Sequence, residues 1–246
     1  MSTADLHIHT RVSDGMATVE SVLEYVQERT ELDVIAITDH EDVTGGLRAR
    51  ELAARRAYRF EVIAGAEVTT LQGHLLALFI EKAPRSFRRV ESALDMIHAQ
   101  NGVAVVPHPM SWLTRSIGER AIARIAESPE SGTWFDGIEL ANPSPAGRVT
   151  AAKAVALNLR WDLAATGGSD AHHLAHIGSG WTEFEGKGAA ALKAALLDRS
   201  TVAHMAAYPS LREVGYGQVA MGLAWGYAAT PRKMLSWASP RRRRTE

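Results

Sequence analysis

The amino-acid sequence predicts an α/β fold in which seven strand–loop–helix units form one parallel barrel. Short apolar stretches alternate with amphipathic stretches in units of roughly 30 residues, a pattern typical of a parallel barrel or a doubly wound sheet. Ionisable residues follow most of the expected strands, which favours the barrel, because a doubly wound sheet places its site at one crevice and uses few strand ends. The chain has 246 residues, and 46% of them are hydrophobic, which is enough for one full core.

The composition excludes several classes of protein. The formal net charge is -1, so no excess of either sign indicates a nucleic-acid or membrane partner. The chain contains no cysteine, which excludes disulfides, thiolate catalysis and sulfur-ligated metal and leaves nitrogen and oxygen as metal ligands. The first expected strand follows Met1 within a few residues and leaves no room for a signal segment, so we expect a cytoplasmic protein.

Residues 5–15 read Asp-Leu-His-Ile-His-Thr-Arg-Val-Ser-Asp-Gly. In an extended strand, residues i and i+2 point to the same face, so His7 and His9 would project into one shared space, as metal ligands do. Ser-Asp-Gly at 13–15 has the chemistry of a turn, which would bring Asp14 back over the end of the strand. The alternative is that two histidines on a strand merely face water.

Strands and helices alternate through the first half of the chain. A helix follows the opening strand, because Val19, Val22, Leu23 and Val26 have the spacing of one helical face and Thr18 precedes them as N-cap. We expect strands at 34–38 and 62–66, a helix at 47–58 and a hairpin partner at 73–78. Polar residues stand at the ends of these strands: Asp39, His40, Glu67 and, at the start of the hairpin partner, His74.

The second half continues the alternation. We expect a helix that is opened by Ser86 and closed by Asn101-Gly102, strands at 103–106, 137–140 and 163–166, and helices at 117–125 and 148–159. His108 follows the first of these strands, Glu139 lies on the second, and Gly-Gly-Ser-Asp-Ala-His at 167–172 follows the third. The apolar side of the helix at 148–159 is expected to be Ala152, Val155, Ala156 and Leu159.

Five short blocks, in this order, make the sequence similar to the PHP (polymerase and histidinol phosphatase) family. They are Asp-Leu-His-Ile-His-Thr at 5–10, Thr-Asp-His at 38–40, Gly-Ala-Glu at 65–67, His-Pro at 108–109 and Gly-Ser-Asp-Ala-His at 168–172. The resemblance spans residues 4–200. It implies a distorted seven-stranded (β/α) barrel of the PHP type over residues 1–205, with a short C-terminal extension at 206–246.

The resemblance also implies a cluster of two to three divalent metal ions, and Mn, Fe or Zn would suit its nitrogen and oxygen ligands. Carried over by position, His7, His9, Glu67 and Asp170 would hold one ion and carry the catalysis. Metals about 3.5 to 4 Å apart lower the pKa of a shared water toward about 7, which produces a bridging hydroxide for in-line attack on a phosphate. The remaining ligands would be His74 and His108 at a second ion that Glu67 bridges, and Asp14, His40 and His172 at a third.

Other polar residues allow two interpretations. Arg148, after the loop at 142–145, and Arg115, after His108-Pro109, would each bind a substrate phosphate or simply face solvent. Asp5 and Asp39 are expected to orient ligands rather than to bind metal. We expect rim hydrogen bonds from Glu139 and Asn142, and structural roles for His98, His173 and His176.

The C-terminal part is apolar and rich in glycine at 214–229 and ends in an arginine run at 241–244. The apolar stretch is marginally short for a membrane span, so we expect it to fold against the barrel. Peripheral membrane attachment is the less favoured alternative, with Trp225, Tyr227 and Trp237 at the interface and the arginines on anionic lipid.

These observations favour a metal-dependent phosphoesterase that acts on a small phosphorylated substrate. Single-domain family members with the Ser-Asp-Gly turn resemble those that hydrolyse nucleoside 3',5'-bisphosphates or shorten oligoribonucleotides from the 5' end, and no stable nucleic-acid complex is expected. Histidinol-phosphate phosphatase and a non-catalytic metal-binding module are the alternatives. All nine candidate positions carry competent ligands, which favours an active enzyme.

Overall fold

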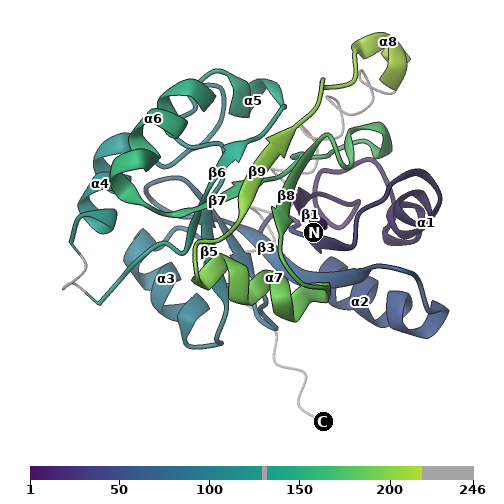
Figure 1. Cartoon of the computed structure of the whole chain (residues 1–246), viewed down its shortest axis with the longest axis horizontal. Helices are drawn as coiled ribbons and strands as arrows, with labels where there is room; N and C mark the ends of the chain where they lie inside the picture. The colour runs from purple at the N-terminus through teal and green to yellow at the C-terminus, as the bar shows by residue number, and fades with distance from the viewer. Residues whose placement is uncertain (129–131, 218–246) are drawn as a thin grey trace, which may run out of the picture.

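The computed structural model describes residues 1–128 and 132–217, which form a nearly closed, barrel-shaped sheet surrounded by helices (Figure 1). The predicted α/β barrel is therefore confirmed. The described sheet has nine strands rather than the seven expected. The strands are β1 (Ser2–Ile8), β2 (Val34–Ile37), β3 (Glu61–Thr69), β4 (His74–Leu78), β5 (Val103–Val106), β6 (Gly137–Ala141), β7 (Ala164–Gly167), β8 (Gly180–Phe184) and β9 (Val202–Met205).

The two additional strands, β8 and β9, carry weak sequence signals. β8 contains two aromatic residues, Trp181 and Phe184, and alternates buried with half-buried positions. β9 has no buried residue at all, so it lacks the apolar face by which a strand is recognised in a sequence. Both were missed because pairing with β1 and with each other, rather than their own composition, makes them strands.

Helices cover the outside of the barrel. They are α1 (Val19–Arg29), α2 (Thr44–Arg56), α3 (Val90–His98), α4 (Glu119–Ala126), α5 (Pro145–Arg148), α6 (Ala151–Trp161), α7 (Gly188–Leu197) and α8 (Leu211–Val214), with a 3-10 turn η2 (Leu174–His176). Figure 1 shows α1 and α2 on one side of the sheet and α3, α4 and α6 on the other.

Two helix boundaries predicted from the sequence are wrong. Ser86 does not open a helix, because its hydroxyl donates a hydrogen bond to the Glu41 carboxylate and the Phe87 amide donates to Thr69 O, which ties this loop to the end of β3. α3 begins only at Val90. The helix expected at 148–159 begins only at Ala151, as α6, and Arg148 is the last residue of the short helix α5 before it.

The apolar face predicted for α6 is also wrong. The helix buries Ala154 and Trp161, whereas Leu159 is 87% exposed and Val155 is 47% exposed. Trp161 packs in the core beneath the helix and its indole N–H donates to Glu127 Oε1 at 3.1 Å. The large indole decides which side of α6 faces the barrel, and the smaller aliphatic residues are turned outward.

The sheet runs in the order β7-β6-β5-β4-β3-β2-β1-β8-β9. The pairs β1–β2, β2–β3, β5–β6 and β6–β7 are parallel, and β4 is antiparallel to both of its neighbours. β2 and β5 are buried along their whole length, as parallel strands covered on both faces should be. The carboxyl ends of the parallel strands and the amino end of β4 therefore lie at the same end of the barrel.

Two glycines, Gly167 and Gly168, allow the end of β7 and the segment after it to pack closely against β8 and β1. A Cβ on Gly167 would lie 2.1 Å from the carbonyl oxygen of Trp181, and a Cβ on Gly168 would lie 2.7 Å from the Cβ of His7. Only glycine permits such close approach. The segment after β7 thus reaches β1, where Ala171 pairs with Ile8 in an isolated parallel bridge.

One end of the barrel is closed by α7. This helix contacts β3, β5, β7 and β8, which stand on different sides of the barrel, and its Leu192 and Leu196 join the core formed by the inward side chains of the strands. Polar side chains lie at the opposite end of the barrel, where the parallel strands have their carboxyl ends.

The extension predicted at 206–246 is described only as far as residue 217, including α8. Trp225, Tyr227, Trp237 and the arginine run lie outside the described residues, so the docking and membrane alternatives and the boundary at 205/206 stay predictions. In the described part of the chain, no helix is long and apolar enough to cross a membrane.

Candidate metal centre

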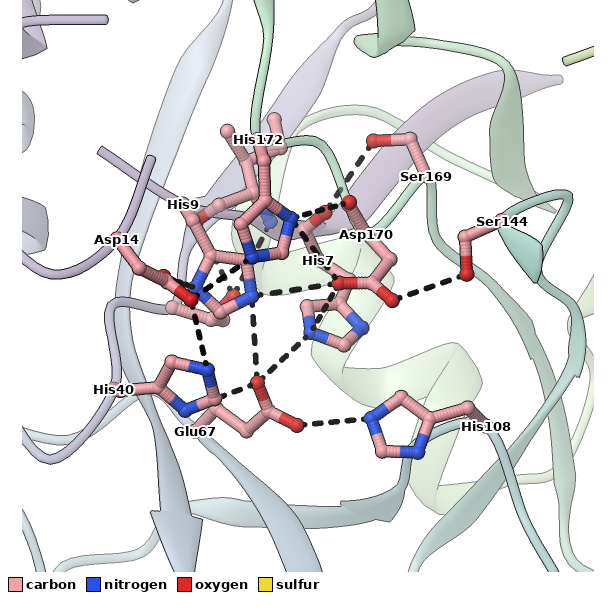
Figure 2. Close-up of polar contacts among 12 residues, drawn as sticks. His7, His9, Asp14, His40, Glu67, His108, Ser144, Ser169, Asp170 and His172 are labelled. Carbon is pink, nitrogen blue, oxygen red and sulfur yellow. Dashed lines mark hydrogen bonds and ion pairs between the residues drawn. The ribbon is translucent and has the colours of Figure 1, made fainter. Parts of the chain in front are cut away.

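The open end of the barrel gathers all nine side chains that the sequence analysis singled out as metal ligands. They come from β1 and its following turn (His7, His9, Asp14), the end of β2 (His40), β3 (Glu67), the start of β4 (His74), the end of β5 (His108) and the segment after β7 (Asp170, His172). Figure 2 labels the candidate ligands other than His74, which point toward one shared space. Their roles as ligands stay a proposal.

The opening strand places its two histidines as the alternation predicts. His7 and His9 both point to the cluster, with ring centroids 5.1 Å apart, while Leu6 and Ile8 are buried in the apolar core. The turn after the strand is held by hydrogen bonds from the Ser13 and Gly15 amides to Thr10 O, both at 3.0 Å. This turn brings Asp14 to the cluster.

Glu67 occupies the middle of the cluster, and its two carboxylate oxygens face different histidines. Oε2 lies 3.3 Å from Nε2 of both His7 and His9, and 3.4 Å from Nδ1 of His40. Oε1 lies 2.8 Å from Nδ1 of His74 and 3.0 Å from Nε2 of His108. One carboxylate can therefore serve two cations at once.

Two aspartates complete the anionic part of the cluster. Asp170 Oδ1 lies 3.6 Å from Nε2 of both His7 and His9. Asp14 Oδ2 lies 3.1 Å from Nε2 of His172 and 3.5 Å from Nε2 of His40. Asp14 Oδ1 faces His9 Nδ1 at 3.5 Å, so His9 stands between the two aspartates.

Burial and close pairing shift the pKa values of these groups strongly. Burial alone would raise the pKa of Glu67 and Asp170, but the surrounding histidines outweigh it and hold both pKa values well below the usual range. Burial would lower the pKa of His7, yet Asp170, Glu139 and Glu67 raise it well above its usual value. Against the same effect of burial, Glu67 and Asp14 raise the pKa of His40 to about 9. The site thus favours cations in contact with ionised carboxylates.

The hydrogen bonding of the cluster fits bound metal. His9 Nδ1, His9 Nε2, Asp14 Oδ1 and His74 Nδ1 are buried and have no hydrogen-bond partner among the described residues. His74 Nδ1 is only 2.8 Å from Glu67 Oε1 without hydrogen-bond geometry, as expected when both atoms aim at a common cation. Buried polar atoms are rarely left unpaired, and imidazole and carboxylate are the ligands of Zn, Mn and Fe. The residues present therefore fit divalent ions.

The structure groups the candidate ligands somewhat differently from the resemblance. Sets of ligand atoms within 4.8 Å of one another are His9, Asp14, His40 and His172; His7, His9 and Asp170; His7, Glu67 and His108; and His40, Glu67 and His74. His9 joins the Asp14 set, and His40 joins Glu67 and His74, so neighbouring sets share ligands. The candidate ligands therefore form overlapping sets that share His7, His9, His40 and Glu67.

The two aspartates expected to orient ligands hydrogen-bond the segments that carry candidate ligands, and their orienting role stays a prediction. Asp39 accepts hydrogen bonds from the amide and hydroxyl of Thr10 at 2.8 and 2.7 Å and from both groups of Ser13, which anchors the turn that carries Asp14. Asp5 accepts from the amides of Ser169 at 2.9 Å and Gly178 at 2.8 Å, next to Asp170. Burial raises the pKa of Asp5 to about 6. Neither carboxylate is among the metal-compatible sets.

Glu139 has a larger part in the site than the sequence suggested. Its Oε1 accepts a hydrogen bond from His7 Nδ1 at 3.1 Å, and its Oε2 accepts from the His108 amide and from Asn142 Nδ2, both at 2.7 Å. A carboxylate can only accept, so Nδ1 of His7 carries a proton toward Glu139, and Nε2, beside Glu67, is the nitrogen that would give up its proton to bind a cation. Glu139 therefore orients His7 and the loop that carries His108.

Two serines that the sequence analysis missed also contact candidate ligands. Ser116 Oγ hydrogen-bonds His108 Nδ1 at 2.8 Å, and Ser144 Oγ donates to Asp170 Oδ2 at 3.1 Å. Neither serine lies in a motif, because each reaches its partner through the fold of a loop. No local signal could have identified them.

The remaining candidates lie at the rim or away from the cluster. Arg115 is exposed, with its guanidinium 5.7 Å from the ring centroid of Phe87, and Arg148 is exposed at the end of α5. His98 hydrogen-bonds Asp136 at 2.9 Å and stacks on Trp134, and both partners precede the amino end of β6, opposite the strand ends that carry the cluster. His176 hydrogen-bonds the Tyr208 hydroxyl at 2.9 Å, and burial lowers its pKa to about 4.

The fold and the site define an α/β barrel with candidate nitrogen and oxygen ligands gathered at one end. The PHP domain model matches residues 5–131, and a PHP-associated model matches residues 152–201. The chain belongs to the PHP family, a family of metal-dependent phosphoesterases, as the five sequence blocks predicted.

Relatives of known activity match only parts of the chain. A phosphoribosyl 1,2-cyclic phosphate 1,2-diphosphodiesterase of Eggerthella lenta is 35% identical over 104 residues, which cover 39% of this chain and 38% of that protein. A 3',5'-nucleoside bisphosphate phosphatase of Chromobacterium violaceum is 40% identical over 88 residues, 34% of this chain and 30% of that protein. The 5'-3' exoribonuclease Rnm of Salmonella typhimurium is 33% identical over 143 residues, 56% of this chain and 43% of that protein. The matches span less than half of each of these relatives.

A solved structure has the same fold. A two-domain protein of Bacteroides vulgatus, described as containing a predicted PHP-like metal-dependent phosphoesterase, superposes with a TM-score of 0.67 at 21% identity. The superposition covers 83% of this chain and 64% of that protein.

Proposed function

We propose that this protein hydrolyses a phosphate ester of a nucleotide, either a nucleoside 3',5'-bisphosphate or the 5' end of a short oligoribonucleotide, with two to three divalent ions (Mn, Fe or Zn) at the cluster. The observation that carries the proposal is the position of Glu67, whose two oxygens face two different sets of imidazoles. A carboxylate shared in this way is the arrangement that multinuclear hydrolytic sites need.

The proposed roles of the residues follow from their contacts. His7, His9, Glu67 and Asp170 would hold the central ion and His74 and His108 the ion on the other side of Glu67. Asp14, His40 and His172 would hold a third. When bound, divalent ions polarise a phosphoryl oxygen and lower the pKa of water.

The protein itself would supply orientation and charge. Glu139 and Ser144 keep His7 and Asp170 in place through hydrogen bonds of 3.1 Å each. Because the fork of an arginine binds a phosphate through two hydrogen bonds and keeps its charge, Arg115 and Arg148 at the rim are proposed to bind a phosphate that flanks the one being cleaved. Relatives named as a nucleoside bisphosphate phosphatase and as an exoribonuclease support a nucleotide substrate.

The test combines metal analysis with a panel of phosphate esters. Purified under metal-replete conditions, the protein is expected to contain two to three divalent ions per chain and to lose activity with a chelator. The panel should hold a nucleoside 3',5'-bisphosphate, a short 5'-phosphorylated oligoribonucleotide, histidinol phosphate and a 1,2-cyclic phosphate of ribose. Preference for histidinol phosphate or for the cyclic ester would reject the nucleotide substrate, and less than one metal per chain without activity would indicate a non-catalytic module.

A further inference from the structure

Exposed apolar side chains lie on the loops that are joined by hydrogen bonds to the segments carrying His74 and His108. Trp112 is 75% exposed, Leu113 is 48% exposed and Leu71 is 57% exposed, and Phe87 is also partly open to solvent. They lie on three loops, after β3, before α3 and after β5. Single exposed apolar residues are common, but a tryptophan with this exposure beside a polar site is not explained by the core of the barrel.

These loops are fastened to the candidate ligands and to one another. The His74 amide donates to Arg115 O at 2.8 Å, and the Leu71 amide donates to Arg88 O at 2.9 Å. The loop after β5 leaves and returns at His108: the Ser111 amide donates to His108 O at 3.2 Å, and Ser116 Oγ hydrogen-bonds the His108 ring at 2.8 Å. Trp112 therefore lies on a short loop that is closed at both ends on a ligand of the cluster.

A positive charge accompanies the apolar surface. The Arg115 guanidinium lies over the ring of Phe87, 5.7 Å from its centroid, and its Nη2 donates to Thr70 O at 3.5 Å. Arg115 is on the same loop as Trp112, and these contacts hold its side chain against the loops that carry Phe87 and Leu71. An aromatic ring next to an arginine is the combination by which proteins bind single-stranded nucleic acid, since the ring stacks on a base and the cation meets a phosphate.

We propose that Trp112 is a base-stacking residue, so that the loops bearing Leu71, Phe87, Trp112 and Leu113 form a nucleobase subsite beside the cluster. The inference rests on the proposed function, because it names the part of a nucleotide that this surface binds. A second copy of the chain is the less fitting occupant: the exposed apolar side chains stand on loops that are tied to His74 and His108, where a partner would cover the ligands. Stacking tolerates any base, so the subsite confers preference for nucleotides over base-free esters without selecting a sequence.

The experiment compares Trp112→Ala with wild type on a matched pair of substrates, adenosine 3',5'-bisphosphate and the base-free ester ribose 5-phosphate. Trp112→Phe retains an aromatic ring at the same place. Trp134→Ala is the control, because Trp134 is also a partly exposed tryptophan but stacks on His98 at the other end of β6. The Kd of adenosine 3',5'-bisphosphate is measured in parallel by calorimetry on the same proteins under conditions that prevent turnover.

Trp112→Ala is expected to raise both KM and Kd for the nucleotide by about tenfold or more, which is the range of base–aromatic stacking, and to change kcat/KM for the base-free ester by less than about twofold. Trp112→Phe should restore most of the loss, and Trp134→Ala should match wild type. Equal changes on both substrates, an unchanged Kd, or a change of oligomeric state without a change of KM would overturn the subsite while leaving phosphoester hydrolysis intact. If wild type cleaves no ester in the panel, the proposed function fails, and the effect of Trp112→Ala on Kd alone then decides the subsite.

Discussion

Replacing Glu139 with glutamine is expected to weaken metal binding about 10- to 100-fold, the effect of losing a carboxylate that orients a metal-bound histidine. Glutamine has nearly the same volume, so no cavity forms. Its single amide oxygen cannot accept from His7 on one side and from the His108 amide and Asn142 on the other, where the carboxylate now accepts at 3.1, 2.7 and 2.7 Å. The amide NH2 group must face one of these donors.

The consequence for His7 follows from its tautomer. If the new amide oxygen keeps the two donors at His108 and Asn142, its NH2 group faces His7 Nδ1, so in the neutral form of the ring, which is the form that binds a cation, Nδ1 becomes an acceptor and the proton stands on Nε2. Nε2 is the atom that lies 3.3 Å from Glu67 Oε2, and a protonated nitrogen cannot bind a cation. A loss of 10- to 100-fold corresponds to about 1.4 to 2.8 kcal/mol of binding free energy.

The assay is a competition titration of metal-stripped protein with a fluorescent chelator, together with thermal melting. Asp136→Asn is the matched control, because Asp136 is also a buried carboxylate on the segment that leads into β6 and accepts from His98 at 2.9 Å and the Ala104 amide at 2.7 Å, away from the cluster. The control should lose stability but keep its metal affinity. Metal affinities that are equal in Glu139→Gln and wild type, or equally reduced in both variants, would show that Glu139 does not act through His7.

Further perturbations separate the parts of the site. Glu67→Ala should abolish hydrolysis because it removes a ligand from both sets of imidazoles, whereas Asp14→Ala should remove one ion by elemental analysis and leave measurable turnover; near-normal turnover of Glu67→Ala would contradict this assignment. Arg148→Ala should raise KM strongly for a nucleoside 3',5'-bisphosphate and leave hydrolysis of a simple aryl phosphate unchanged, and equal loss on both would indicate structural damage. Although burial opposes it, Glu67 and Asp14 raise the pKa of His40 to about 9 in the protein without metal, so this ring is protonated at neutral pH and must lose its proton to bind a cation. Metal affinity should therefore rise with pH up to about 9, and calorimetry in buffers of different ionisation enthalpy should detect proton release; an affinity independent of pH between about 6 and 9 would refute this coupling.

Much of the fold and all nine of the candidate ligands could be predicted from the sequence, because the signals are local. The uninterrupted apolar residues of β2 and β5 predict that these strands are fully buried. His7 and His9 point in the same direction because side chains alternate along a strand. Ser-Asp-Gly predicted the turn that brings Asp14 to the cluster. Such patterns involve residues that are a few positions apart in the sequence, so they can be interpreted without knowing which strand or helix packs next to them.

The features that could not be predicted from the sequence depend on contacts between segments that are distant along the chain. β8 and β9 are strands because they pair with β1 and with each other, and α6 turns Leu159 outward because Trp161 fills the core beneath it. The contact of Glu139 with His7 likewise depends on the packed barrel. Gly168 allows the segment after β7 to lie close to His7, and the Glu139 carboxylate accepts a hydrogen bond from the ring of this residue, which is 132 positions away in the sequence. The neighbours of a residue in the sequence determine the direction in which its side chain points from its own strand or helix. The group that the side chain contacts depends on how the sheet closes, and only the packed barrel determines this closure.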